Sequence, residues 1–282
     1  MKYNRGEFLK VIGLTGAAAL AGIPTLSASA TSTSTPKPAD TLRLGLASYT
    51  LRTLNLDQVI KVATKLDLKS IALKSMHLPL ESSPDDIKAA AAKVRAAGLT
   101  LYGAGVIYMK TAKEVEAAFA YAANAGLEMI VGVPNHDLLS LANEQVKKYN
   151  IKLAIHNHGP GDDLYSSPSD VFTKIKDLDK RIGLCIDIGH VKRIGQDPVA
   201  MIEKYSDRLY DMHMKDVNKD TGDGTPLEVG RGIIDIVGVI KALKKVKYTG
   251  AVAFEYEKDG DDPVPGLAES VGYVRGVMKM VG

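Results

Sequence analysis

Residues 183–190 read Gly-Leu-Cys-Ile-Asp-Ile-Gly-His, an apolar, β-prone run that leads into Asp187. Three more runs have the same form, and they end in His156, His213 and Glu255. Connections of helical length separate the four runs. Four ligand-type side chains, each at the end of its own strand, predict one mononuclear metal site at the mouth of a barrel of parallel strands.

Apolar runs alternate with amphipathic stretches from about Thr41 onward. We expect strands over residues 42–48, 70–75, 100–106, 129–134, 152–158, 183–188, 209–214 and 250–255. We expect helices over residues 56–66, 84–97, 112–125, 138–149, 169–178, 198–205, 233–244 and 266–280. This α/β alternation predicts parallel pairing with right-handed crossovers and closure into a single-domain (β/α)8 TIM barrel. An open doubly wound sheet is the alternative, but residues 45–48 lack the glycine pattern of a dinucleotide-binding loop.

The first 30 residues have the features of an export signal. Basic residues precede an apolar run over residues 11–23, and Ala28-Ser29-Ala30 fits a small-residue cleavage site. Residues 4–10 resemble a twin-arginine signal, but Gly6 stands where the second arginine would be, so the Sec and twin-arginine routes both stay open. A retained anchor helix is the alternative, although the run is shorter than the roughly 20 apolar residues of a membrane span.

We therefore expect a signal peptide over residues 1–30, a flexible linker over residues 31–41 and the barrel over residues 42–282, in a protein exported to the periplasm. The net charge of the whole chain is +3, and the signal contributes most of it. For a nearly neutral mature chain we expect no nucleic acid and no membrane surface as partner, while an oligomer stays open. Cys185, the only cysteine, lies in an apolar strand and predicts a buried free thiol.

Polar side chains beyond the strand ends are candidates for chemistry. His190 follows Asp187 by three residues, in a loop over the mouth where it would touch a substrate rather than the metal. Lys215 follows His213 by two residues and could hold a substrate hydroxyl, stabilise an enolate or pair with Asp216. Each ligand has a structural alternative: Asp187 could cap the next helix or pair with an arginine, and a lone histidine is often structural.

Two residues on other strands extend this set. Lys74 ends the second strand and could be a base or an electrophile, although a solvated loop lysine is the commoner case. His158 lies two residues after His156, so both side chains face the same side of the strand, and His158 would line the mouth. Asn157 faces the other side. Glu257 faces the same side of its strand as Glu255 but lies further out. Possible contacts to sugar hydroxyls are Tyr49, Tyr102, Tyr108, Asn135 and His136.

Together these motifs resemble the xylose isomerase-like TIM barrels, the sugar phosphate isomerase/epimerase family. The resemblance covers about residue 42 to the last residue. It rests on residues 156–159 (HNHG), 187–190 (DIGH), 213–216 (HMKD), 229–235 (VGRGIID) and 248–250 (YTG) leading to Glu255. The glycines of residues 229–235 indicate either a hinged lid or a simple turn. The resemblance implies one divalent ion held by Asp187, His213 and Glu255, with His156 in the fourth place.

His156 departs from the pattern of the family. Epimerases and keto-aldose isomerases of the family carry glutamate there, and they use carboxylates on strands five and eight as paired proton carriers. The resemblance therefore implies one carboxylate base here, Glu255, with His158 or Lys74 as candidates for a second. Two histidines, one aspartate and one glutamate favour Mn²⁺, Zn²⁺, Co²⁺ or Fe²⁺ over Mg²⁺.

From the resemblance we expect a metal-dependent sugar isomerase/epimerase that works through an enediolate on an unphosphorylated sugar, since phosphorylated sugars are mainly intracellular. One alternative is a lyase that cleaves 3-oxo-glycosides by β-elimination, as similar exported members of the family do. Another is a non-catalytic sugar-binding barrel. In each case the partner is a small-molecule sugar or glycoside. Endonucleases of the same fold use more metal ligands and a basic groove, which the near-neutral charge disfavours.

Overall fold

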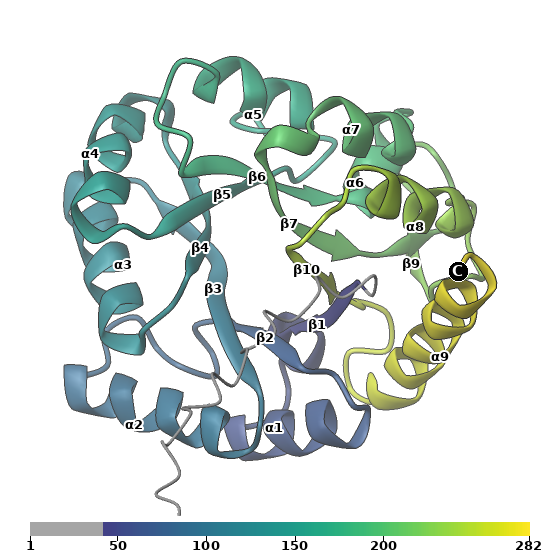
Figure 1. Ribbon diagram of the computed structural model, residues 1–282, viewed down its shortest axis with the longest axis horizontal. Helices are drawn as coiled ribbons and strands as arrows, with labels where there is room; N and C mark the ends of the chain where they lie inside the picture. The colour runs from purple at the N-terminus through teal and green to yellow at the C-terminus, as the bar shows by residue number, and fades with distance from the viewer. Residues whose placement is uncertain (1–41) are drawn as a thin grey trace, which may run out of the picture. The chain divides into compact units, whose positions relative to one another are not determined.

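A closed barrel of parallel strands forms the centre of the domain in this computed structural model, which describes residues 42–282 (Figure 1). The order around the barrel is β1-β10-β7-β6-β5-β4-β3-β2. The strands are β1 Arg43–Ala47, β2 Ser70–Leu73, β3 Thr100–Met109, β4 Met129–Pro134, β5 Lys152–His156, β6 Ile182–Asp187, β7 Leu209–Met214 and β10 Ala251–Phe254. This confirms the predicted TIM barrel. The predicted signal peptide and linker lie outside the described residues.

Helices surround the barrel and cover the outer face of its strands (Figure 1). They are α1 Leu56–Lys65, α2 Pro84–Ala96, α3 Ala112–Ala125, α4 Leu139–Tyr149, α5 Pro168–Ile175, α6 Ile188–Arg193, α7 Pro198–Lys204, α8 Ile236–Lys245 and α9 Val264–Met280. Short 3-10 turns occur at η1 Ser48–Leu51, η2 His136–Leu138 and η3 Ser206–Arg208. None of the helices between residues 42 and 282 combines the length and hydropathy of a membrane span.

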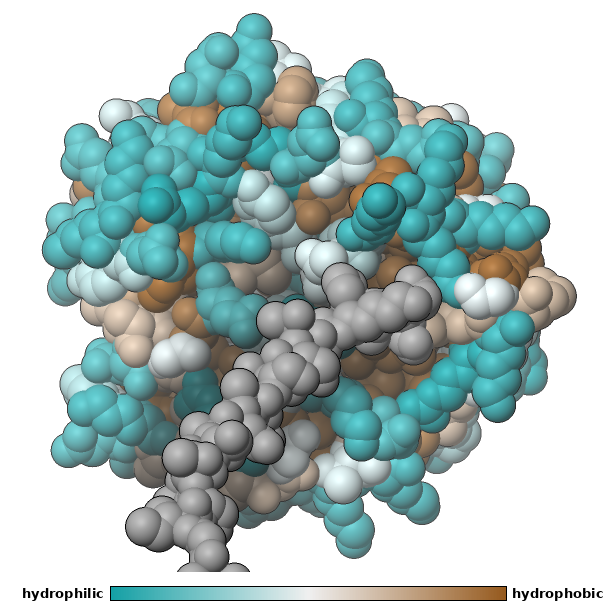
Figure 2. Space-filling view, in the orientation of Figure 1, coloured by the Kyte–Doolittle hydropathy of each residue, from teal (hydrophilic) through white to brown (hydrophobic). Residues whose placement is uncertain are grey.

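Local sequence explains where helices α1, α2, α3 and α5 begin. Asn55, Thr111 and Ser167 each form a reciprocal capping box at the start of α1, α3 and α5. Ser83 caps α2, with Pro84 in the first helical position. Because helices cover the strands outside and side chains fill the barrel inside, every residue of β4 and β6 is buried. Figure 2 shows hydrophilic residues over most of the helical rim, with smaller hydrophobic patches between them.

Several element boundaries differ from the expected ones by up to three residues, and two short elements were not expected. Residues 188–193 form helix α6 directly after β6, whereas we expected the strand to run to residue 188 and a loop to follow it. Helix α8 begins at Ile236, three residues later than predicted, because Asp235 caps it. A two-stranded antiparallel ribbon, β8 Asp216–Val217 with β9 Pro226–Leu227, follows β7 and is too short to show a sequence pattern.

Strand register brings the predicted ligands to one level. Asp187 pairs with His213 across β6 and β7. Phe254 pairs with Met214 across β10 and β7, so Glu255 leaves β10 one residue later, where its N–H donates to Met214 O at 3.2 Å. His156 is the last residue of β5, beside Cys185 of β6. All these positions are at the carboxyl ends of the strands, where barrel enzymes build their active sites.

Candidate metal centre

Four buried side chains converge at the carboxyl end of the barrel. His156, Asp187, His213 and Glu255 each offer one ligand atom, and these atoms all lie within 4.8 Å of one another. His156 Nε2 lies 3.1 Å from His213 Nδ1 and 3.4 Å from Asp187 Oδ2. His213 Nδ1 lies 3.0 Å from Glu255 Oε2 and 3.8 Å from Asp187 Oδ2. The cluster could therefore hold a metal ion.

These spacings fit the coordination polyhedron of a divalent metal. Bonds of about 2.0–2.2 Å place neighbouring donors roughly 3.3–3.6 Å apart in a tetrahedral site and somewhat closer in an octahedral one. Asp187 Oδ2 is fully buried and accepts no hydrogen bond; the ammonium of Lys215 lies 3.0 Å away, and the lone pairs of this oxygen stay available to a metal ion. The donor set of two nitrogens and two carboxylates suits Zn²⁺, Mn²⁺, Co²⁺ or Fe²⁺.

Asp187 has a second role at the end of β6. Its Oδ1 accepts a hydrogen bond from His190 N at 2.9 Å and caps helix α6. Capping and metal binding were competing interpretations of this residue, and the structure allows both because different oxygens are used. Asn157 donates to Asp187 O at 3.3 Å and accepts from Asp187 N at 3.1 Å, which joins the ends of β5 and β6 and fixes His156 beside Asp187.

Lys215 fills the space beside two of the donor oxygens. Its Nζ lies 3.0 Å from Asp187 Oδ2, 2.9 Å from Glu255 Oε2 and 2.9 Å from Glu257 Oε2, and its side chain is 4% exposed. Of the three possibilities that the sequence left open for Lys215, pairing with Asp216 is the one that this geometry disfavours. Burial would lower the pKa of Lys215, but the three carboxylates raise it well above its usual value, so the ammonium stays charged.

Asp216 instead ties down the glycine-containing loop. Its buried carboxylate accepts main-chain N–H groups of Val217 at 2.9 Å, Gly230 at 2.9 Å, Gly232 at 2.9 Å and Ile234 at 3.1 Å. A Cβ added at Gly232 would lie 2.1 Å from Asp216 Oδ1, which explains the glycine. Because one buried carboxylate fixes this loop through four hydrogen bonds, the structure favours a simple turn over a hinged lid for residues 229–235.

The charge states around the cluster follow from burial and pairing. Burial opposes the charge of Asp187 and Glu255, but neighbouring cations hold the pKa of both carboxyls well below the usual range. Burial would lower the pKa of His213, yet Glu255 raises it to about 9. Burial lowers the pKa of His156 well below its usual value and that of His190 to about 4, so both rings are neutral at pH 7.

Asp211 lies beneath the cluster, and the sequence analysis missed it. This fully buried carboxylate has Oδ2 3.9 Å from His213 Nε2, and Tyr102 donates a hydrogen bond to its Oδ1 at 3.2 Å. A carboxylate behind a ligating histidine often accepts the N–H of its other ring nitrogen; the 3.9 Å separation here is an ion-pair distance, longer than a hydrogen bond. The sequence contained one sign of this role: Asp211 is an acidic residue inside strand β7, two residues before His213, so both side chains face the same side of the strand. Tyr102, expected at the mouth, is fully buried here instead.

His190, His158 and Lys74 line the mouth around this cluster. His190 is on helix α6 rather than in a loop, with Nε2 3.9 Å from Asp187 Oδ2. The ring of His158 lies 4.4 Å from that of His156, and its Nε2 shares a 2.9 Å hydrogen bond with the hydroxyl of Tyr108. Lys74 Nζ donates to a carbonyl of β3 at 2.5 Å, and burial lowers its pKa. The structure therefore places His158, His190 and Lys215 beside the four candidate ligands, while Lys74 lies further out, 5.9 Å from the ring of Tyr108.

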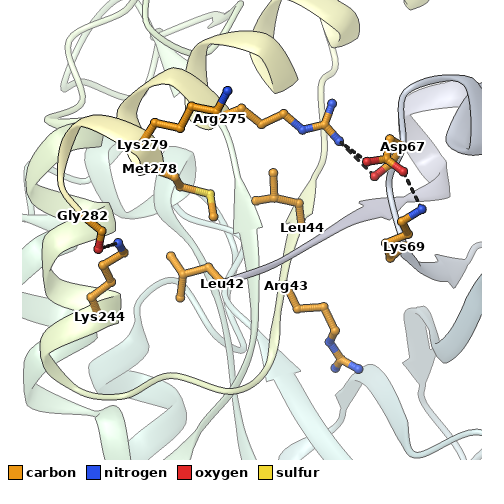
Figure 3. Close-up of a pocket in the computed structure, with 10 residues that line it drawn as sticks. All are labelled: Leu42, Arg43, Leu44, Asp67, Lys69, Lys244, Arg275, Met278, Lys279 and Gly282. Carbon is orange, nitrogen blue, oxygen red and sulfur yellow. Dashed lines mark hydrogen bonds and ion pairs between the residues drawn. The ribbon is translucent and has the colours of Figure 1, made fainter. Parts of the chain in front are cut away.

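A cavity of about 510 Å³ lies at the other end of the barrel (Figure 3). It borders the first residues of β1, with Leu42, Leu44 and Met278 forming its apolar side. Arg275 and Lys69 point toward Asp67 at its edge, where their nitrogens lie 3.8 and 2.5 Å from its carboxylate oxygens (Figure 3). This cavity adjoins the amino end of β1, so it is separate from the metal centre.

Comparison with known proteins agrees with this geometry. The model of one family, described as xylose isomerase-like TIM barrel, matches residues 60–277. Rhizopine catabolism protein MocC of Rhizobium meliloti is 26% identical over 145 residues, 46% of this chain and 44% of that protein. Inosose dehydratase of Lacticaseibacillus casei is 24% identical over 136 residues, 43% of this chain and 45% of that protein. The chain thus spans less than half the length of these curated relatives.

A solved structure shares the whole fold. The 3-keto-D-glucoside 4-epimerase of E. coli superposes with a TM-score of 0.68 at 14% identity, over 84% of this chain and 100% of that one. At this identity the likeness shows the fold alone.

Proposed function

The chain belongs to the xylose isomerase-like TIM barrel family, and on that premise we propose that it is a metal-dependent isomerase or epimerase of an unphosphorylated sugar. The reaction would pass through an enediolate. A relative by sequence carries the name of an enzyme, inosose dehydratase, which supports an enzyme rather than a non-catalytic sugar-binding barrel.

The observation that carries this proposal is the convergence of His156, Asp187, His213 and Glu255 at the carboxyl end of the barrel, with a charged lysine beside them. We propose that these four residues hold Mn²⁺, Zn²⁺, Co²⁺ or Fe²⁺ in preference to Mg²⁺. A bound divalent ion would polarise the sugar carbonyl and so acidify the neighbouring C–H.

The chain's own groups would position the substrate and move the proton. Lys215 and His190 lie where they can donate to the oxygen on which negative charge develops. Glu255 would be the carboxylate proton carrier, although its ion pairs make it a weak base. Neutral His158, hydrogen-bonded to Tyr108, is one candidate for the second proton carrier, and Lys74 is the other.

Charge and location support a substrate without phosphate. A phosphate group would need a free cation at the site. Lys215 lies beside the candidate metal ligands, but its charge is already balanced by three carboxylates. We also propose that the protein is exported to the periplasm, on the strength of the signal-like residues 1–30. N-terminal sequencing of the periplasmic form should find a start near Thr31, and an intact Met1 in a cytosolic fraction would count against export.

A second candidate is β-elimination from a 3-oxo-glycoside. His156, neutral and buried, stands where epimerases of the family carry a glutamate, so one carboxylate base is left at the strand ends. One base can remove the proton next to a carbonyl while a β-substituent leaves. It cannot readily return the proton to the opposite face of the sugar. The name of the relative inosose dehydratase, an elimination enzyme, points the same way.

Proton NMR of the metal-loaded protein with candidate free sugars and 3-oxo-glycosides separates these reactions. A new sugar isomer or epimer supports the leading proposal, and release of the aglycone selects the lyase. Sugar binding without any turnover would leave only the non-catalytic barrel.

A further inference from the structure

Lys215 is held in a position that serves three carboxylates at once. An ammonium group has three donors, and Asp187, Glu255 and Glu257 each place one oxygen within 3.0 Å of Nζ. Asp187 and Glu255 belong to the metal centre, whereas Glu257 lies outside it with its side chain 31% exposed. The lysine therefore joins the centre to a carboxylate at the rim.

The stem of the lysine is fixed by its packing. A Cβ added at Gly189 in the first turn of α6 would lie 2.8 Å from Lys215 Cβ and 3.2 Å from Lys215 Cδ. Because Gly189 has no side chain, the aliphatic part of Lys215 can pack against the first turn of α6. Its ammonium then lies between Asp187 and Glu255. The contact with these two oxygens follows from how the side chain is packed.

The three contacts of Nζ are not equivalent. Only the contact with Glu257 has the geometry of a hydrogen bond, at 2.9 Å. The other two are ion pairs, with Asp187 Oδ2 at 3.0 Å and Glu255 Oε2 at 2.9 Å, and these are the oxygens that face His156 and His213. A divalent ion and the ammonium would therefore share the same two oxygens and repel each other across them.

We propose that Lys215 is an internal competitor for the metal and that Glu257 is the positioning residue that draws its ammonium away from the centre. This inference rests on the proposed metal-dependent function. With a metal on Asp187 and Glu255, the ammonium keeps its hydrogen bond to Glu257 and points to the substrate side. Glu257 thereby sets metal affinity without binding the metal.

Metal affinity of two variants tests this proposal without any substrate. Mn²⁺ or Zn²⁺ alone is titrated into the metal-stripped full protein in competition with a chelator. Lys215→Met removes a repelling charge and should tighten binding on the order of 10-fold. Glu257→Gln leaves the ammonium with only the two ligand carboxylates and should weaken binding by a similar factor. The exposed Glu203–Lys245 pair, 2.9 Å apart on α7 and α8, provides the controls Lys245→Met and Glu203→Gln, which should stay within twofold of the unaltered protein.

The proposal predicts opposite changes in metal affinity, tighter binding by Lys215→Met and weaker binding by Glu257→Gln. Binding by both variants within twofold of the unaltered protein, or weaker binding by Lys215→Met, would overturn it while leaving the metal site in place. If the unaltered protein binds no metal, the proposed function fails together with this inference. Should Lys215→Met fold poorly, as a melting scan would show, Glu257→Gln decides alone, since its side chain is at the rim.

Discussion

Replacing Asp187 by asparagine or by alanine separates the two roles of its oxygens. Both changes remove the charge of Oδ2, which lies 3.4 Å from His156 Nε2 and 3.0 Å from Lys215 Nζ. Losing even a residue behind a metal ligand costs about 10–100-fold in affinity, so losing the ligand itself should cost more than about 100-fold. Both variants should therefore lose metal and activity together.

The two variants should differ in stability. Asparagine keeps an oxygen that can accept the 2.9 Å hydrogen bond from His190 N, whereas alanine leaves this N–H at the start of α6 without a cap. An N-cap contributes about 1 kcal/mol, and an unsatisfied buried N–H about 1–3 kcal/mol. The free energy of unfolding of the metal-free protein should thus be about 1–2 kcal/mol lower for Asp187→Ala than for Asp187→Asn.

Urea denaturation and metal content per chain measure the two effects. Asp197 is a matched control because it caps α7 through Val199 N at 3.0 Å. Asp197→Ala should lose stability relative to Asp197→Asn while both keep one metal per chain. Full metal occupancy in Asp187→Asn, or equal stability of the two Asp187 variants, would refute the reasoning.

Two more substitutions and a pH titration test other parts of the site. His156→Glu adds a hard oxygen donor and should shift preference toward Mg²⁺, measured by competition between Mg²⁺ and Mn²⁺. His190→Ala should lower kcat on the order of 100-fold and leave metal content unchanged, because His190 is not among the four clustered ligands and its Nε2 lies 3.9 Å from Asp187 Oδ2. Glu255 raises the pKa of His213 to about 9 in the metal-free protein, so this ion pair stabilises the fold below about pH 6.5 and is lost as pH rises through 9. Metal must displace that proton, so its apparent affinity should rise about tenfold per pH unit from pH 7 to 9 in chelator titrations, and a flat profile would exclude a protonated His213.

The strands and their polar ends were predictable because they depend on local pattern. Apolar runs of strand length, each ended by a ligand-type residue, place His156, Asp187, His213 and Glu255 on four strands before any register is known. Parallel pairing in one barrel then brings their ends together. The structure confirms the barrel and the clustering, while the metal itself stays a prediction.

The contacts that depend on side-chain paths were not predictable. Pairing with its neighbour Asp216 was one possibility for Lys215, but the two side chains point apart: Asp216 accepts hydrogen bonds from loop N–H groups, and the lysine reaches across to Asp187. Helix α6 was missed because it starts without a connecting residue after β6. Asp211 was missed because the sequence does not show which side chain a carboxylate in a buried strand contacts, and its place beside His213 became clear only from the structure.

The most direct test of the account is metal-dependent exchange of a substrate C–H with solvent. The protein, loaded with one divalent transition metal, is incubated in D2O with the sugar or 3-oxo-glycoside that it converts, and deuterium is located by NMR. The account predicts deuterium at a single carbon next to the carbonyl, with the exchange lost after metal removal, restored by adding metal back and absent from Asp187→Asn. Turnover without solvent deuterium in substrate or product, or full exchange by the metal-stripped protein, would contradict it.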